Sequence, residues 1–101
     1  MQKYEIKMQA GFDVLGGSAR SQAATMTLAP GSSTGGPNNR HPESDQWLYV
    51  ISGEGKAIIE GSETSLGPGS LVLIERGESH AIHNTGDMPL ETISIYAPPA
   101  Y

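Results

Sequence analysis

The sequence predicts a single all-β domain whose strands close into a sandwich or barrel. Its 13 Gly and 7 Pro interrupt the 101 residues at short intervals. The runs between them alternate polar and apolar residues with a period of two or are briefly apolar throughout, which is typical of short strands. No window has a helical period with capping residues, and turn signals recur about every 8 to 12 residues. This rhythm favours a closed antiparallel sheet over an alternating α/β fold.

Seven segments carry the strand pattern. In chain order they are Tyr4–Met8, Ala23–Leu28, Trp47–Ile51, Lys56–Glu60, Leu71–Ile74, Ala81–Asn84 and Glu91–Tyr96. Four of the connecting peptides contain Gly, which supplies the positive φ that tight hairpins need: Ser52–Gly55, Glu60–Glu63, Gly67–Gly69 and Asn84–Asp87. The segment Phe12–Gln22 is the one place where we expect a turn or two of helix.

The composition excludes several classes of function. The chain has 6 Lys+Arg against 11 Asp+Glu, a net charge of -5, and its basic residues are scattered. This argues against nucleic acid or an anionic membrane as a partner, because both are bound by clustered Lys and Arg. The absence of cysteine excludes disulfides, thiolate zinc sites and cysteine nucleophiles, so a metal would need His, carboxylate, amide or water ligands.

The apolar runs, such as Leu71–Ile74, are far shorter than the roughly 20 residues that cross a bilayer. The first residues, MQKYEIKMQ, lack the apolar core of a signal peptide. We therefore expect a cytoplasmic protein. A domain of this size is only marginally stable alone, and a barrel with an exposed sheet edge would gain stability from a second copy, so we expect a homodimer.

The longest polar stretch, Pro30–Arg40, is rich in Gly, Ser, Asn and Pro. Its composition suits either a solvated linker or a loop at the mouth of a binding site. His41 follows it directly and the only Trp, Trp47, lies six residues further on, which favours the second interpretation. At the other end of the chain, Pro98 and Pro99 cannot continue a central strand, so the tail Tyr96–Tyr101 folds over the surface or across a partner.

Residues Gly69, Gly77, His80 and Asn84, within GSLVLIERGESHAIHN, resemble the second conserved motif of the cupin family. That motif is G, five residues, P, one residue, G, two residues, H, three residues, N, and Glu75 replaces its proline. The alternation of a strand places His80, Ile82 and Asn84 on one face and turns His83 outward.

The first cupin motif is G, five residues, HXH, three or four residues, E, six residues, G. Gln46 and Gly53 match its last two positions, His41 takes the place of the second histidine and Asn39 that of the first. Ser33 stands where the opening glycine is expected. The resemblance therefore carries the family's metal-binding quartet over as Asn39, His41, Gln46 and His80.

Two carboxamides stand where the family has an imidazole and its only carboxylate, which lowers the expected affinity for a divalent ion. Two histidines and amide oxygens can still hold zinc, manganese, iron or nickel. Asp45 or Glu43 would supply a carboxylate if the chain were kinked at Pro42. Strand alternation instead points Gln46 inward and Asp45 outward, and places Trp47 opposite Gln46, where it would pack against an outer strand or a second subunit.

The resemblance covers roughly Ala23 to Tyr96 of the single domain 1–101 and implies the cupin double-stranded β-helix, a jelly-roll barrel. Cupins host many activities, so three hypotheses stay open. The first is an enzyme of the dioxygenase, isomerase or decarboxylase type, with a metal at His41, Gln46 and His80 and Glu75 as the one candidate acid or base. The second is a non-catalytic module that binds a sugar-like or other small polar molecule through Asn39, Gln46, His80 and Asn84. The third is a structural dimer with a vestigial pocket.

Overall fold

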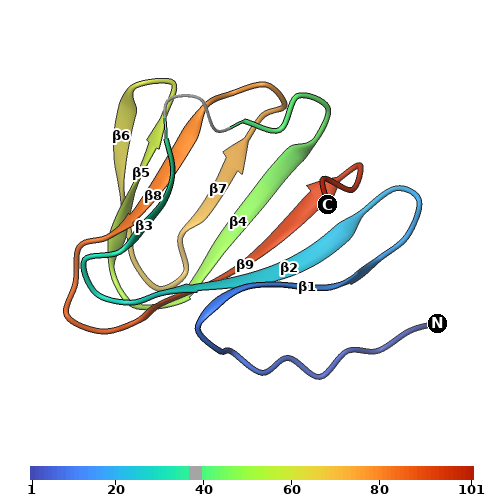
Figure 1. Ribbon diagram of the computed structural model, residues 1–101, viewed down its shortest axis with the longest axis horizontal. Coiled ribbons are helices and arrows are strands. Elements are labelled where there is room, and N and C mark those ends of the chain that lie inside the picture. The colour runs from blue at the N-terminus through green and yellow to red at the C-terminus, as the bar shows by residue number, and fades with distance from the viewer. Residues whose placement is uncertain (37–39) are drawn as a thin grey trace.

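The computed structural model describes residues 1–36 and 40–101 and contains β-strands and no helix in these ranges (Figure 1). The strands are β1 Gly11–Gly17, β2 Gln22–Leu28, β3 Ser33–Gly36, β4 Asp45–Ser52, β5 Gly55–Ile59, β6 Ser62–Leu66, β7 Leu71–Ile74, β8 His80–Asn84 and β9 Leu90–Ala97. The all-β prediction is confirmed. Among the described residues, no helix has the length and apolar character needed to cross a bilayer.

The strands form two antiparallel sheets. One has the order β1-β2-β9-β4-β7 and the other the order β3-β8-β5-β6. Buried apolar side chains from both sheets meet between them and form the core: Leu48 and Val50 of β4, Leu90 of β9, Ala57 of β5, Leu66 of β6 and Ile82 of β8. Strands distant in the sequence, such as β2 and β9, therefore lie side by side around one interior.

Six of the seven predicted strands are present as β2, β4, β5, β7, β8 and β9. The prediction for Tyr4–Met8 is wrong, because this segment pairs with no strand despite its alternating pattern. The helical turn expected within Phe12–Gln22 is also wrong. Most of that segment lies in β1, whose glycines permit a register shift between Val14 and Gly16 as it pairs with β2.

The polar stretch Pro30–Arg40 is not a linker in its described part. Its residues Ser33–Gly36 form β3, which pairs with β8 and so lies at one edge of the smaller sheet. The sequence misses β3 and also β6, because Gly-rich and polar strands at sheet edges bury too few side chains to produce an apolar pattern. Residues 37–39, which include Asn39, lie outside the described residues.

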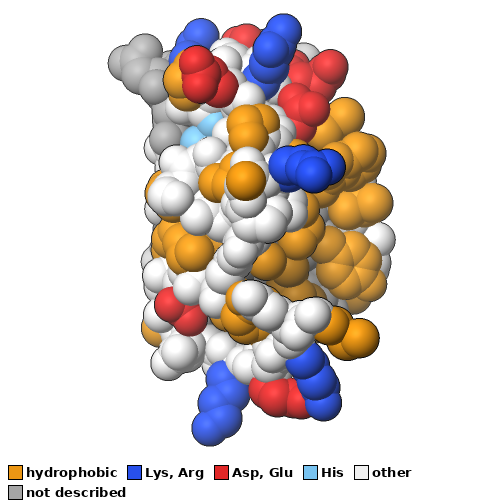
Figure 2. Space-filling model, turned by 90° about the vertical axis from the view of Figure 1, so that its right-hand side faces the viewer, with side chains coloured by type: hydrophobic (Ala, Val, Ile, Leu, Met, Phe, Trp, Pro, Cys, Tyr) orange, Lys and Arg blue, Asp and Glu red, His pale blue; other side chains and the backbone are white. Residues whose placement is uncertain are grey.

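Strand β4 has the predicted alternation. Gln46, Leu48 and Val50 are buried, whereas Trp47 and Tyr49 are about half exposed. The outward side chains continue onto the neighbouring strands, because Trp47 pairs with Ile95 of β9 and Leu73 of β7. We call this exposed apolar surface the outer face; it consists of Trp47, Tyr49, Ile51, Leu71, Leu73 and Ile95. Hydrophobic side chains also gather visibly along one side of the molecule in Figure 2.

The β4–β5 turn depends on Gly53 for two reasons. Its φ is 90°, in the left-handed region, and a Cβ there would clash with the carbonyl oxygen of Pro89 and lie 2.8 Å from Leu90 Cα. Gly61, in the β5–β6 turn, has a similar φ of 80° but open space around it. Substitutions at the two glycines therefore distinguish the cost of a strained φ from the cost of a steric clash.

We predict that Gly61→Ala lowers the free energy of unfolding by about 1 kcal/mol, the cost of a left-handed alanine. Gly53→Ala adds a clash with a neighbouring backbone and should cost roughly 1–3 kcal/mol more, as overpacking does. Urea unfolding of both variants measures the difference. Equal losses would contradict a steric role for the Pro89–Leu90 contact.

Candidate functional site

Three of the four residues assigned by the resemblance line one cavity of about 260 Å³ at one end of the barrel. These are His41, Gln46 and His80. The remaining described lining residues are Gly11, Phe12, Met26, Leu28, Ser33, Thr34, Ile82, Tyr96 and Tyr101. No Lys, Arg, Asp or Glu is among them, so the described lining is neutral unless a histidine is protonated.

Backbone pairing brings the two histidine segments together. The N–H of Gly77 donates to the carbonyl oxygen of His41 at 2.8 Å, and Gly77 has a φ of 80° that suits glycine in the turn before β8. Close by, the N–H of Arg76 donates to Oδ1 of Asp45 at 2.9 Å. These bonds tie the segment before β4 to the turn before β8, and so place His41 beside His80.

The His41 and His80 rings lie with their centroids 5.1 Å apart and tilted by 35°. Burial lowers the pKa of His41 below its ordinary value, and the neighbouring His80 lowers it further. Burial also lowers the pKa of His80, partly opposed by a contact of 3.5 Å between its Nδ1 and the Glu78 carbonyl oxygen. Both imidazoles are therefore held in the neutral form, which is the form that binds a metal.

Gln46 presents an unsatisfied oxygen. Its Nε2 donates to Oγ of Ser94 at 3.0 Å, and this bond orients the amide. Its Oε1 is buried and makes no hydrogen bond to any described residue. Leaving such an acceptor unpaired costs about 1–3 kcal/mol, so a cation or a hydrogen-bond donor is needed to satisfy it. The two imidazoles and this oxygen fit a divalent ion of the zinc, iron, nickel or manganese type.

No carboxylate completes the site in the described part of the chain. Asp45 accepts the Arg76 N–H instead of facing the cavity, and Glu43 and Glu75 are exposed. The kinked alternative with Asp45 or Glu43 as a ligand is therefore wrong, and so is Glu75 as an acid or base in the cavity. Across residues 1–36 and 40–101, no group of three or more His, Cys, Asp or Glu is placed to hold a metal.

Asn84 shares the inward face of β8 with His80, as predicted, but does not line the cavity. Its Nδ2 donates to the carbonyl oxygens of Leu28 and Met88 at 2.9 and 2.8 Å, and its Oδ1 accepts from the Gly86 N–H at 2.9 Å. A ligand-binding role for Asn84 is therefore wrong. The motif asparagine ties together the turns at the opposite end of the barrel.

Aromatic residues that sequence reasoning did not assign form the cavity's outer wall. The Tyr96 ring lies 5.1 Å from His41, and the Tyr101 ring lies 5.5 Å from His41 and 4.7 Å from Phe12, measured between centroids. Burial raises the pKa of Tyr96, and the nearby Tyr101 raises it further, so the phenol stays protonated. The tail thus folds over its own barrel; the two prolines indicated that β9 ends, but no pattern indicated where Tyr101 lies.

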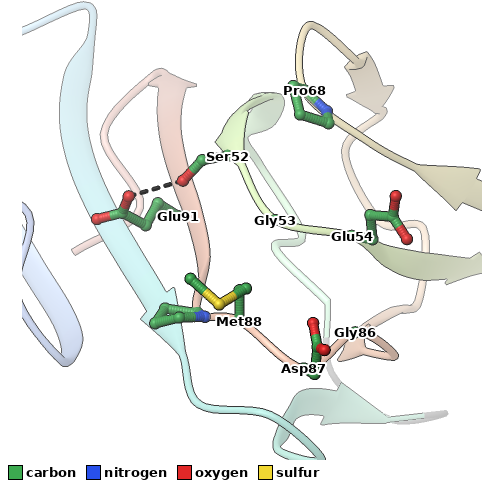
Figure 3. A pocket seen from close by; sticks show the side chains of 9 residues that line it. Ser52, Gly53, Glu54, Pro68, Gly86, Asp87, Met88 and Glu91 are labelled. Atoms are coloured by element: carbon green, nitrogen blue, oxygen red, sulfur yellow. Dashed lines mark hydrogen bonds between the residues drawn. The ribbon is translucent and has the colours of Figure 1, made fainter.

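A larger hollow of about 620 Å³ lies among turns that include Ser52–Glu54 and Gly86–Pro89 (Figure 3). None of the residues predicted for the site lines it. Its polar groups include the carboxylates of Glu54, Asp87 and Glu91, and Glu91 accepts a hydrogen bond from Ser52 Oγ at 2.7 Å. The smaller cavity is our candidate site, because among the described residues neutral imidazoles and an unsatisfied buried oxygen meet only there.

Comparison with known proteins agrees with this geometry. The family described as "Cupin domain" matches residues 24–96. The chain belongs to the cupin family. An oxalate-binding protein of Thermotoga maritima is 35% identical over 72 residues, which are 71% of this chain and 58% of that protein. The tetracenomycin polyketide synthase protein TcmJ of Streptomyces glaucescens is 34% identical over 71 residues, 70% of this chain and 46% of that protein. The chain thus spans about half the length of these curated relatives.

Solved structures resemble this cupin along most of its length. BH2720 of Bacillus halodurans superposes with a TM-score of 0.85 at 27% identity, covering 94% of this chain and 75% of that one. A predicted oxalate decarboxylase of Thermotoga maritima superposes with a TM-score of 0.72 at 31% identity, covering 80% of this chain and 69% of that one. These likenesses establish the cupin double-stranded β-helix.

The lowered histidine pKa values predict a pH-dependent stability in metal-free protein. Unfolding returns both histidines to a pKa of about 6.5, so the unfolded state binds more protons below that pH. We expect the free energy of unfolding to fall as the pH drops through and below about 6.5. In the double variant His41→Gln/His80→Gln this decrease should be smaller. Urea unfolding at several pH values, with chelator present, measures it; an unchanged pH dependence in the double variant would contradict the assignment.

Proposed function

We propose that this cupin binds a divalent metal ion through His41, His80 and Oε1 of Gln46, and that the cavity holds a small polar organic molecule beside it. The observation that carries the proposal is the meeting of two neutral imidazoles and a buried unpaired amide oxygen in one cavity. A cation would satisfy the Gln46 oxygen, whose burial without a partner is unfavourable, and neutral imidazoles beside it are suitable ligands for such an ion.

The proposed ion would favour a small anionic or chelating ligand beside it. A bound divalent ion would supply the positive charge that the described lining lacks. The names of the similar Thermotoga maritima proteins, an oxalate-binding protein and a predicted oxalate decarboxylase, point to small carboxylates. The cavity has room for about nine waters at 30 Å³ each, which suits a ligand of that class or somewhat larger.

In this proposal the residues act by binding and orienting rather than by acid–base chemistry. Ser94 orients the Gln46 amide, and His41 and His80 hold the ion and are then not free to transfer protons. The described lining offers no carboxylate as an alternative base. We therefore propose ligand binding ahead of the dioxygenase, isomerase or decarboxylase activities that the fold also hosts.

A second candidate is metal-free binding of a neutral, hydrogen-bonding ligand. The observation that favours it is that no carboxylate of the described residues joins the two histidines in a metal-binding group, which weakens the site for a cation. Such a ligand would donate an O–H or N–H to Gln46 Oε1 and another to the ring nitrogen of His80 that does not face the Glu78 carbonyl oxygen.

Metal binding separates the two candidates. We predict that chelator-stripped protein takes up one equivalent of Ni²⁺, Zn²⁺, Mn²⁺ or Fe²⁺, observed by titration calorimetry and elemental analysis. Removing an imidazole in His80→Ala should weaken this uptake by about 10-fold or more. The matched control is His83→Ala, because His83 is the neighbouring histidine of β8 outside the cavity. Absence of uptake by the wild type, or equal uptake by both variants, would sink the metal proposal and leave the metal-free one.

We further propose that the outer face pairs with a second copy of the chain. Its six side chains together expose on the order of 500 Å², the scale of an interaction patch. Two copies packed through it would bury about 1,000 Å², the lower bound for a specific interface. The face carries no charged residue, so its association with itself meets no like-charge repulsion.

Trp47→Lys places a charge at the centre of this face, between Ile95 and Leu73, and should convert a dimer to a monomer. Met88→Lys places the same charge at another exposed apolar residue, outside the outer face, and should leave the dimer intact. Sedimentation velocity over a range of concentrations measures both. A wild-type monomer, or a dimeric Trp47→Lys, would contradict the pairing and point to a different partner for the face.

A further inference from the structure

The C-terminal residues are held over the cavity by one buried side chain. Gln22, the first residue of β2, makes three hydrogen bonds with the backbone of Ala100 and Tyr101. Its Nε2 donates to the Tyr101 carbonyl oxygen at 2.8 Å, while its Oε1 accepts from the N–H groups of Ala100 and Tyr101 at 3.1 and 3.0 Å. All three bonds go to the tail, so Gln22 secures a segment that no strand pairing secures.

This attachment places the Tyr101 ring among three others. Its centroid lies 4.7 Å from Phe12, 5.3 Å from Tyr96 and 5.5 Å from His41. The ring lines the cavity, although the residue as a whole is 62% exposed. One side of Tyr101 therefore faces the cavity and the other faces solvent. The residue forms a wall of the cavity that can move outward without disturbing the core.

We propose that Tyr101 is a ligand-contacting residue that limits the size of the molecule the cavity accepts, and that Gln22 is its positioning residue. The proposal rests on the proposed function for the identity of the ligand, but the wall itself depends only on the aromatic contacts and the three hydrogen bonds. The molecule selected is a small chelating compound with at most one ring. A larger one has to displace Tyr101 from Phe12 and His41.

Chemical modification tests the wall without any metal. Diethyl pyrocarbonate modifies neutral imidazoles, and peptide mass spectrometry reads each histidine separately. In chelator-stripped protein, we expect His41 to react several-fold faster in Tyr101→Ala, which removes the ring, and in Gln22→Leu, which removes the three hydrogen bonds that hold the tail. Tyr101→Phe keeps the ring and should react at the wild-type rate.

Two controls accompany the chemical-modification experiment. His83 lies outside the cavity and serves as an internal standard in every variant. Tyr4→Ala removes an exposed tyrosine that does not line the cavity and should leave the reactivity of His41 unchanged. Equal rates for His41 in the wild type and in Tyr101→Ala, with His83 unchanged, would overturn the proposal.

Ligand size is tested on Co²⁺-loaded protein with picolinate and quinoline-2-carboxylate, followed by the visible spectrum of the metal. Both compounds present the same nitrogen and carboxylate, and the second has one additional fused ring. We expect the wild type to prefer picolinate by about tenfold or more, the scale of steric discrimination in an apolar pocket. In Tyr101→Ala and Gln22→Leu the preference should largely disappear.

The modification experiment and the ligand-size experiment together distinguish an error in the role of Tyr101 from an error in the proposed function. A preference for picolinate that survives unchanged in Tyr101→Ala overturns the role of Tyr101, even if the metal binds normally. Absence of Co²⁺ binding instead counts against the proposed function, and the reactivity of His41 then decides the role of Tyr101 alone.

Discussion

Strand β4 sends only every second side chain into the barrel, and this alternation decides where the rest of the protein places its groups. Leu48 and Val50 turn inward at the middle and far end of the strand and join the apolar core. Gln46 turns inward at the near end, next to the cavity. The inward amide of β4 therefore lies at the cavity end of the strand, away from the apolar core residues. The same alternation turns Trp47 and Tyr49 to the outer face.

The buried amides of Asn84 and Gln46 differ in how completely they are hydrogen-bonded. At the opposite end of the barrel, the Asn84 amide uses both of its ends in hydrogen bonds to the turns, and so stabilises the fold. Gln46 uses only Nε2, and its Oε1 makes no hydrogen bond to a described residue. Both are buried carboxamides. The two amides therefore differ in a single acceptor, which is satisfied in Asn84 and unpaired in Gln46.

Gln22 shows how the same chemistry supports a third role. Across β2, β9 and β4, the register places Gln22 opposite Tyr96 and Tyr96 opposite Gln46, so the two amides flank one aromatic residue. Gln22 uses its amide to bind the tail backbone, whereas Gln46 turns its oxygen to the cavity. Gln46 in the cavity and Gln22, which holds the Tyr101 wall, thus occupy neighbouring register positions of one sheet. The tail is held by a residue 79 positions earlier in the chain.

The sequence by itself determined the all-β class and most central strands, through period-two alternation and glycines in turns. Its resemblance to the two cupin motifs, which end at Gly53 and Asn84, also brought together His41, Gln46 and His80, which line one cavity. Only the tertiary structure decided that Asn84 serves the turns, that Asp45 binds the Arg76 N–H and that Tyr101 covers His41. Each of these depends on which free hydrogen-bonding group or ring a side chain meets after the sheets have closed. Such meetings join distant parts of the chain, so no local pattern of residue types encodes them.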